Sequence, residues 1–482
     1  MINTKFLFFK KGGSRSMQDK DEKKKFAMPD SYVILFIMLI LATILTYVLP
    51  SGSFDRDDSA DVPTVIPDSY SSVNSDSVGF MDFFVSIQSG MIEAADIIML
   101  VLIIGGSFAI IDHSEAIYSG IMKLINKTRE KKLILIIAVA TAFSVAGFLG
   151  VMHTAVIAFI PVGVIISRAL KLDAIIGVAI IYLGAYSGYT IAGLDPVTTG
   201  FAQRIAEIPV FSGLSFRFVL YLAVLISSIT YIVFYVRKIE ADPSKSIMGE
   251  NRFNEKESAH TGVDENMVFT LRHKIVLIYF VLALSAYTIG VFTSDWGLNE
   301  MSAIFIIIGL GTAVIERIKP NDFVKLFVSG AQKMIYAALI VGLARSIVVI
   351  LEDGYVLDTM VNYFAHILEP LPATFGAVSM FLFNLLFNLI ITSGSGQAAI
   401  VMPILAPLAD LVGFSRQIAV VAYNMGDGFT NTIAPTSGIL MASIAVAGVP
   451  WTKWIRFMFP LLLIWIVIGV VAIFAAFAIG LT

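Results

Sequence analysis

The chain has 482 residues, of which 57% are hydrophobic and 14% are charged. A soluble protein carries roughly a quarter charged residues, so this composition predicts a polytopic membrane protein whose solvent is the lipid bilayer. The net charge of -3 argues against a nucleic-acid partner. The absence of cysteine excludes disulfides and thiolate metal sites. With no phosphate-binding glycine-rich loop and no histidine cluster, neither ATP-driven work nor a resident cofactor is expected.

The hydropathy pattern separates plain spans from interrupted ones. A helix that crosses the bilayer needs about 20 mostly apolar residues. Such stretches occur at 31–50, 91–111, 216–236, 275–294, 301–316, 326–351 and 457–480. Two further regions, 133–212 and 375–450, are equally apolar but are broken by Gly, Pro, Ser, Thr and Asp. We therefore expect an all-α fold.

The flanking charges predict the orientation. Lysine and arginine are concentrated in residues 1–30, whereas the segment after the first span is acidic, with Arg56 as a single cation. Because cytoplasmic flanks carry the excess of Lys and Arg, we expect a cytoplasmic N-terminus. Counting spans from there also places the polar linker 238–272 inside. The lean charge and missing cysteines fit a bacterial plasma (inner) membrane.

The two halves of the chain match each other at an offset of about 240 residues. Segment 82–112 resembles 322–353 in its phenylalanines, its serine and its terminal acid. By the span count these segments run in opposite directions, so the repeats are inverted, which is typical of secondary transporters with a binding site at the midplane. The predicted units are a basic terminus (1–30), a first span and acidic loop (31–78), the first repeat (79–237), the linker (238–272), connecting spans (273–320) and the second repeat (321–482).

Each half contains a hairpin with a Gly-rich tip, followed by a helix that breaks at the midplane. The tips are 147–154 and 392–397, and the predicted breaks are 187–196 and 426–435. Irregular backbone at membrane depth is tolerated only where it is buried in protein or lines a cavity, so these four segments are expected to surround the site. The sequence leaves open whether the hairpin arms are re-entrant or fully cross the membrane.

Asp195 and Asp427 are the principal candidates, because each is predicted in one of the two breaks, at corresponding depth, where a charged side chain is costly and hence functional. The alternative is that each carboxylate only caps a helix end. His153 is either a proton carrier or a structural histidine. Arg345 contacts an anionic substrate or, as we favour, forms a structural ion pair.

The full set of predicted site residues gathers the polar groups of the tips and breaks. For substrate binding these are His153, Thr154, Tyr189, Thr190, Asp195, Thr198, Thr392, Ser393, Gly394, Ser395, Gly396, Gln397, Asn424, Asp427, Thr430 and Asn431; for a coupling Na⁺ or H⁺ they are Ser187, Asp195, Asp427 and Asn431. No catalytic residue and no metal ligand is predicted. A single Ser or Thr in such a segment is commonly bonded to its own helix, so the prediction rests on their concentration.

Nearly the whole chain resembles the YfcC family of DcuC-like (C4-dicarboxylate anaerobic carrier) transporters, in the ion transporter superfamily. The most specific stretches are 188–213, 393–417 and 426–454, with weaker ones at 49–56, 65–70, 105–111 and 147–162. The resemblance implies a homodimer with scaffold and transport domains, two hairpins and elevator-type movement. It also implies either C4-dicarboxylates or basic amino acids as substrates. The chain departs from the family pattern at Met152 and His153, where a Glu pair is usual, and at Asp195 and Val197, where Asn-Pro-Phe is usual.

The expected function is a secondary active transporter for a small amino acid or a related carboxylate-bearing metabolite, working by ion coupling or exchange. The alternative is a C4-dicarboxylate transporter, in which Na⁺ or H⁺ would have to neutralise the two aspartates. An intramembrane enzyme is disfavoured because no nucleophile has a partnered base. A passive channel is disfavoured because two polar breaks indicate a closed central site.

Overall fold

The computed structural model describes residues 31–57, 64–66, 68–74, 77–117, 119–120, 123, 132–150, 152–195, 197–253, 269–294 and 296–481. The described chain is mostly helical, as expected. The basic segment 1–30, Pro196 and residues 254–268 of the predicted linker lie outside the described residues. The few strands all belong to the loop after the first helix, where β1 (Gly52–Ser53) pairs with β4 (Ser71–Ser72) and β2 (Arg56–Asp57) with β3 (Thr64–Val65).

The helices follow the predicted order in both halves. The first half contains α1 (Ser31–Val48), α2 (Phe80–Glu93), α3 (Ala95–His113), α5 (Lys132–Phe148), the 3₁₀ helix η1 (Thr154–Phe159), α6 (Ile160–Ala169), α7 (Ala174–Val178), the π-helix η2 (Ala179–Leu183), α8 (Gly184–Tyr189), α9 (Thr199–Ile205), α10 (Leu214–Ala241) and the short η3 (Pro243–Lys245). The second contains α11 (Leu271–Ser294), α12 (Leu298–Glu316), α13 (Pro320–Lys333), α14 (Ile335–Asp353), α15 (Leu357–Leu368), α16 (Ala373–Phe387), α17 (Gly394–Val412), α18 (Arg416–Asn431), α19 (Gly438–Val446) and α20 (Trp451–Ala478).

Six described helices are long and apolar enough to cross a bilayer: α3, α10, α12, α14, α17 and α20. Two predicted spans were wrong in their boundaries. Segment 91–111 contains a helix break at Ala94, and segment 326–351 contains one at Met334. A one-residue break leaves the hydropathy of a window unchanged, so the sequence pattern did not detect it. The two breaks occupy matching positions in the two halves.

The helix pairs on either side of these breaks pack reciprocally, α2 against α14 and α3 against α13. A Cβ on Gly90 of α2 would lie 2.5 Å from the backbone nitrogen of Ser346, and one on Gly330 of α13 would collide with the carbonyl of Gly105. Small residues let the helix backbones approach this closely in a membrane. Each half thus packs its first helix of the pair against the second helix of the other half, which is expected if the halves are related. The inversion of the halves across the membrane stays a prediction.

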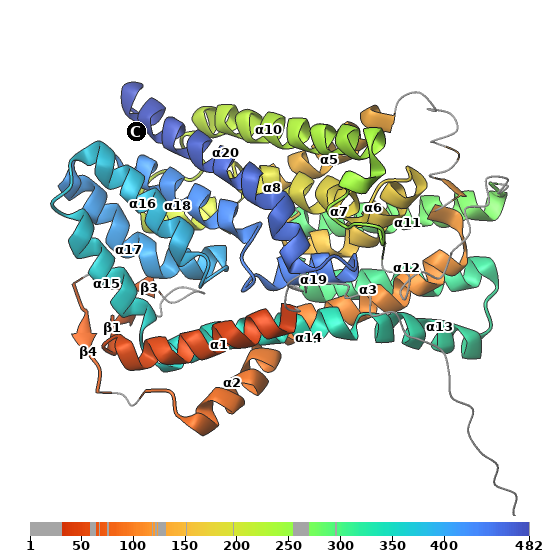
Figure 1. Ribbon diagram of the computed structural model, residues 1–482, viewed down its shortest axis with the longest axis horizontal. Coiled ribbons are helices and arrows are strands. Elements are labelled where there is room, and N and C mark those ends of the chain that lie inside the picture. Colours follow the sequence, from red (N-terminus) through yellow and green to blue (C-terminus); the bar gives the residue numbers. More distant parts are fainter. Residues whose placement is uncertain are drawn as a thin grey trace, which may run out of the picture.

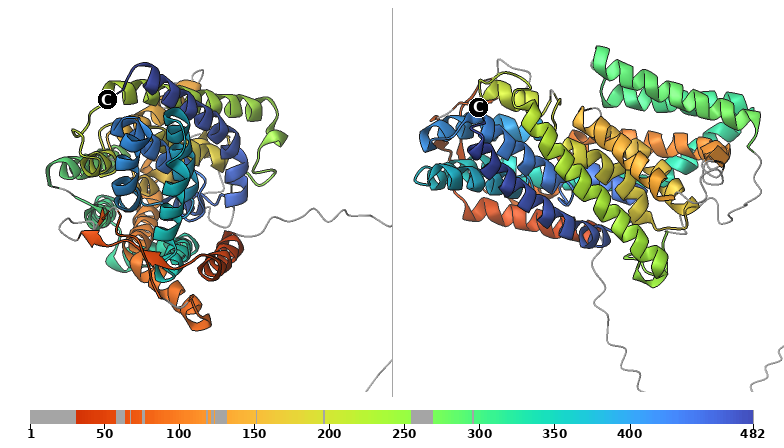
Figure 2. Two further views of the ribbon diagram at one scale, coloured as in Figure 1. Left: turned by 90° about the vertical axis from the view of Figure 1, so that its left-hand side faces the viewer. Right: turned by 90° about the horizontal axis from the view of Figure 1, so that it is seen from above.

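The long helices run along the length of the molecule, with α1 and α14 on one side and α10 and α20 on the other (Figure 1). The strands, α15, α16 and the C-terminus lie toward one end, whereas α6, α7, α11 and α13 lie toward the opposite end. Figure 2 shows that α11 and α12 project from the body at that second end. The hairpin formed by α16 and α17 and the hairpin formed by α5 and α6 therefore occupy opposite ends of the molecule.

The second predicted break, 426–435, was placed too early. Helix α18 continues through Asp427 to Asn431, and the irregular segment spans 432–437. The two glycines that suggested a break serve helix packing instead, because a Cβ on Gly426 would collide with Asn384 and one on Gly428 with Thr190. Asp427 therefore lies in a helix and Asp195 in the irregular segment between α8 and α9. The prediction that both aspartates lie in breaks at corresponding depth is wrong for Asp427.

Candidate functional site

The second tip, the first break and α18 meet at Gly394. A Cβ built on this glycine would lie 2.5 Å from Thr198 Cγ2, 3.1 Å from the Tyr189 hydroxyl and 3.4 Å from Asp427 Oδ2. The Tyr423 hydroxyl donates to the Gly394 carbonyl and holds the start of α17 in place. Residues from both halves, predicted separately from the two polar segments, thus converge on one buried point. Only glycine fits there without displacing a neighbour.

Asp427 carries the least compensated carboxylate of this cluster. Its side chain is 2% exposed, and the hydrogen bond described for it comes from Asn431 Nδ2 at 3.4 Å. Asn388 Nδ2 donates to the Asp427 backbone carbonyl at 2.6 Å and to Thr430 Oγ1 at 2.9 Å. The amide oxygens of Asn388 and Asn431 are buried and have no partner among the described residues. A buried anion for which one hydrogen bond is described suits a cation, because a buried charge is costly unless it is paired.

Asp195 is compensated by its own chain. Its carboxylate accepts from the Val197 nitrogen at 2.8 Å, the Thr198 nitrogen at 3.4 Å and the Thr198 hydroxyl at 2.7 Å. These bonds fix the turn before α9 but do not cap that helix, because its N-cap residue is Thr198 and no side-chain capping bond is described there. The Asp195 carboxylate therefore orders the segment that brings Thr198 to Gly394.

His153 lies against the cluster through its ring. The imidazole stacks on Tyr189, with ring centroids 4.2 Å apart and an angle of 8° between the planes. It precedes the first residue of η1 and has no side-chain capping bond. The Tyr189 hydroxyl is buried without a described partner, so the stacked pair presents an unpaired donor beside Gly394. This stacking places the first tip beside the Tyr189 hydroxyl.

Most of the predicted neutral groups bond locally. Thr190 and Thr430 donate to backbone carbonyls of their own helices, and Gln397 donates to Asn384 Oδ1 at 2.8 Å. Ser393 accepts from the Gly396 nitrogen and caps α17, and Thr392 donates to the Thr436 carbonyl at 3.4 Å. No contact with Asp427 is described for Thr154, Ser395 or Gly396. Ser187 bonds to Ser144 at 2.8 Å and to the Gly184 carbonyl, so its described hydrogen bonds lie outside the Asp427 cluster.

Arg345 forms the structural ion pair that we favoured. Its Nε lies 2.7 Å from Glu93 and its Nη2 3.6 Å from Glu352, which joins α14 to α2. All three side chains are partly exposed. Glu93 is the last residue of α2, and Glu352 is near the end of α14. Within the described part of the chain, no group of three or more His, Asp or Glu side chains is arranged to hold a metal ion.

The sequence analysis missed Arg217. This arginine lies in the first turn of α10 and is 1% exposed. Its Nη1 donates to Asn424 Oδ1 at 2.8 Å and to Thr199 Oγ1 at 3.2 Å. Its position inside the apolar stretch 216–236 was the available signal, but a charge so near the end of a span is usually interfacial. Asn388 was missed because nothing in the sequence places the end of α16 beside α18.

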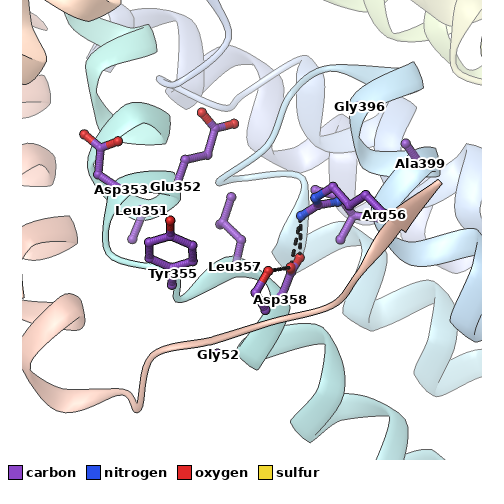
Figure 3. Close-up of a pocket in the computed structure, with 12 residues that line it drawn as sticks. Gly52, Arg56, Leu351, Glu352, Asp353, Tyr355, Leu357, Asp358, Gly396 and Ala399 are labelled. Carbon is purple, nitrogen blue, oxygen red and sulfur yellow. Dashed lines mark hydrogen bonds and ion pairs between the residues drawn. The ribbon is translucent and has the colours of Figure 1, made fainter. Parts of the chain in front are cut away.

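A pocket of about 610 Å³ reaches the second tip from the end of the molecule that carries the strands. Glu352 and Asp353 at the end of α14 line one wall, and the ion pair between Arg56 and Asp358, 3.0 Å apart, lies across from them (Figure 3). Gly396 and Ala399 of α17 close the inner side. We call this pocket the acidic vestibule. It leads toward the second tip, which contains Gly394.

Comparison with known proteins identifies the family of this chain. The family model described as C4-dicarboxylate anaerobic carrier, DcuC, matches residues 28–478. The chain belongs to the DcuC family. It is therefore a multi-pass membrane transporter.

Two curated relatives match almost end to end. A putative basic amino acid antiporter, YfcC, from Escherichia coli is 32% identical and covers 90% of this chain and 93% of its own. An uncharacterized protein from Haemophilus influenzae is 28% identical and covers 94% of this chain and 97% of its own. The resemblance to the YfcC family is thereby confirmed.

Among solved structures, the YdaH transporter of Alcanivorax borkumensis is 17% identical with a TM-score of 0.42, and it covers 94% of this chain and 99% of that chain. MtrF of Neisseria gonorrhoeae is 14% identical with a TM-score of 0.41, covering 93% and 95%. These similarities are low in both measures, and no residue role follows from them.

Proposed function

We propose that this DcuC-family protein is a secondary active carrier for a small amino acid, with basic amino acids as the first candidates, or for a related carboxylate-bearing metabolite. The observation that carries this proposal is the buried Asp427 carboxylate, which receives one weak hydrogen bond beside Gly394. A cationic group of the substrate, or a coupling ion, would complete it. The Escherichia coli relative that is named a putative basic amino acid antiporter supports the same substrate class.

The arrangement of the hairpins suggests how access would alternate. Helix α16 has 15 residues, fewer than the roughly 20 needed to cross the bilayer, so the hairpin of α16 and α17 is proposed to be re-entrant. The acidic vestibule would lead a cationic substrate to this second tip, and the hairpin of α5 and α6 would serve the opposite side. An elevator-type movement in a homodimer would then expose the Gly394 cluster alternately to the two sides of the membrane. The substrate or the coupling ion would shift the balance between these two states by binding one of them more tightly.

A second candidate is a C4-dicarboxylate carrier, as the family description names. Asp427 would repel a dianion unless a cation neutralised it. The unpaired oxygens of Asn388 and Asn431 beside Asp427 offer the oxygen ligands that Na⁺ would use. Dicarboxylate transport through this site would therefore require Na⁺ or H⁺, whereas exchange of basic amino acids would not.

The test is counterflow in proteoliposomes loaded with arginine, ornithine or succinate, each with and without a Na⁺ or pH gradient. We expect counterflow of the amino acids, and Asp427→Asn should abolish it while the protein remains folded. Asp195→Asn should reduce counterflow less, because an asparagine oxygen still accepts from the Val197 nitrogen.

The matched control is Asp322→Asn, which removes an exposed carboxylate whose partner Lys325 lies on the same helix. This variant should transport like the unsubstituted protein. Counterflow of succinate alone, and only with a cation gradient, would replace the amino-acid proposal by the second candidate. Undiminished counterflow in Asp427→Asn would exclude Asp427 from the site.

A further inference from the structure

Arg217 is a buried cation whose donors are mostly unused. Two of its nitrogens, Nε and Nη2, are buried and have no hydrogen-bond partner among the described residues. The third, Nη1, makes both described bonds, to the neutral oxygens of Asn424 and Thr199. No ion pair joins it to a carboxylate in the described part of the chain. A guanidinium presents five donors in a fixed fork, so most of its capacity is left free.

An unpaired charge at this depth needs a reason. Burying an ion costs several kcal/mol, roughly, even after the surroundings relax, and only an opposite charge with good hydrogen bonds compensates it. A purely structural role, tying α10 to α18 and α9, would be met by a neutral side chain that donates to Asn424 and Thr199. A permanent positive charge with a free fork instead matches the planar, bidentate geometry of a carboxylate.

The position of Arg217 relative to Asp427 is set by α18. Asn424, Asp427 and Asn431 follow one another at intervals of three and four residues and therefore share one face of this helix. Arg217 bonds to the first of the three. Residues three apart on a helix have Cβ atoms about 5–6 Å apart, so Asn424, the residue that Arg217 contacts, lies about one helical turn from Asp427. A positive and a negative group at this spacing complement a zwitterion.

We propose that Arg217 binds the carboxylate of the transported molecule, while Asp427 faces its cationic group or the coupling ion. This inference rests on the proposed function, which it deepens by assigning the substrate carboxylate to a charged side chain. The site would then have two ends. Arg217 and Thr199 would form the end that binds the carboxylate, and Asp427 and Asn431, farther along α18, would form the end that binds the cationic group or the coupling ion.

The test uses the full chain purified in detergent and compares ligands that differ only in a carboxylate. Thermal stability is measured with arginine against argininamide and with succinate against its monoamide, succinamate, at constant ionic strength, because stabilisation follows ligand occupancy. In the unsubstituted protein the carboxylate member of at least one pair should bind at least about tenfold more tightly than its amide. In Arg217→Gln this preference should fall to near unity, and Arg217→Lys should restore part of it.

A second variant keeps the proposal testable if Arg217→Gln does not fold. Asn424→Asp places a carboxylate 2.8 Å from Arg217 Nη1 and so supplies an internal partner. We expect this variant to be at least as heat-stable without ligand and to lose the preference for the carboxylate probe. Arg204→Gln, which removes an exposed arginine of α9, is the control and should keep the preference.

The proposal is wrong if no carboxylate probe shifts the unsubstituted protein more than its amide does. It is also wrong if Arg217→Gln or Asn424→Asp keeps the preference. These outcomes are separate from a failure of the proposed function, which is measured as counterflow and its loss in Asp427→Asn. A protein that exchanges amino acids but does not distinguish arginine from argininamide would retain the function and lose the assignment of Arg217.

Discussion

At the scale of single residues, the site depends on one glycine and one carboxylate from the second half meeting a turn from the first. Asp195 accepts one hydrogen bond from Val197 and two from Thr198, and these bonds order the turn that places Thr198 beside Gly394. Asp427 remains available because its own helix supplies only Asn431. The two acids have similar sequence contexts but different surroundings: the Asp195 carboxylate is bonded to its own turn, whereas the Asp427 carboxylate is available to a ligand.

The close contact at Gly394 gives a direct prediction. Gly394→Ala adds a Cβ 2.5 Å from Thr198 Cγ2 and 3.4 Å from Asp427 Oδ2, which forces the tip away from the break. Overpacking of this kind costs about 1–3 kcal/mol, so substrate affinity in counterflow should fall by about fivefold to 150-fold if the whole cost falls on the bound state. Gly200→Ala nearby, whose Cβ would lie 3.4 Å from Val210, should change affinity little. Equal affinities in the two variants would contradict the convergence at Gly394.

At the scale of elements, the exchange of partners between α2, α3, α13 and α14 holds the two halves together. Gly90 lies against Ser346 and Gly342 of α14, and Gly330 lies against Gly105 and Ala109 of α3. In lipid the driving force for such pairs is close packing rather than the hydrophobic effect. The ion pair between Arg345 and Glu93 adds little, because both side chains are partly exposed.

Substitutions at the two crossing points should therefore have similar effects. Gly90→Ala and Gly330→Ala each place a methyl group against the backbone of the partner helix and should each lower the free energy of unfolding by about 1–3 kcal/mol. Denaturant unfolding of the purified protein measures this. Gly200→Ala, which lies inside α9 and whose Cβ would lie 3.4 Å from the nearest described atom, should not lower the free energy of unfolding. A large effect at one crossing and none at the other would argue against related halves.

At the scale of the whole molecule, the strand-bearing end and the linker end are predicted to face opposite sides of the membrane. The vestibule opens at the first end, and η3 with the start of the linker follows α10, which leads toward the second (Figures 1 and 2). The absence of cysteine makes this orientation testable without background labelling. The orientation also decides which hairpin meets substrate outside the cell.

Ser71→Cys in β4 and Glu250→Cys after η3 are the reporters, since both positions are exposed. In intact bacterial cells a membrane-impermeant maleimide should label Ser71→Cys, because the acidic loop is predicted to be outside. Glu250→Cys should react only after permeabilisation. The unsubstituted chain, which has no thiol, is the control. The reverse pattern would invert the orientation, and labelling of both in intact cells would refute the span count.

The sequence alone determined the class of protein, the order of the helices, the two tips and most of the polar residues around them. These follow from composition and local pattern, because lipid demands long apolar helices and tolerates interruptions only where they serve a site. The Arg345 ion pair and the choice of Asp427 as a candidate also came from the rarity of charge at membrane depth.

Only the tertiary structure decided which of these groups meet. Gly426 and Gly428 were interpreted as a break, but α16 and α8 press against them, and a glycine in sequence does not state whether it bends a helix or admits a neighbour. The roles proposed for Arg217 and Asn388 depend on their hydrogen bonds to α18, and both bonds join residues more than 30 positions apart in the chain. Contacts between distant segments depend on how the helices pack, and that information is not carried by any local window.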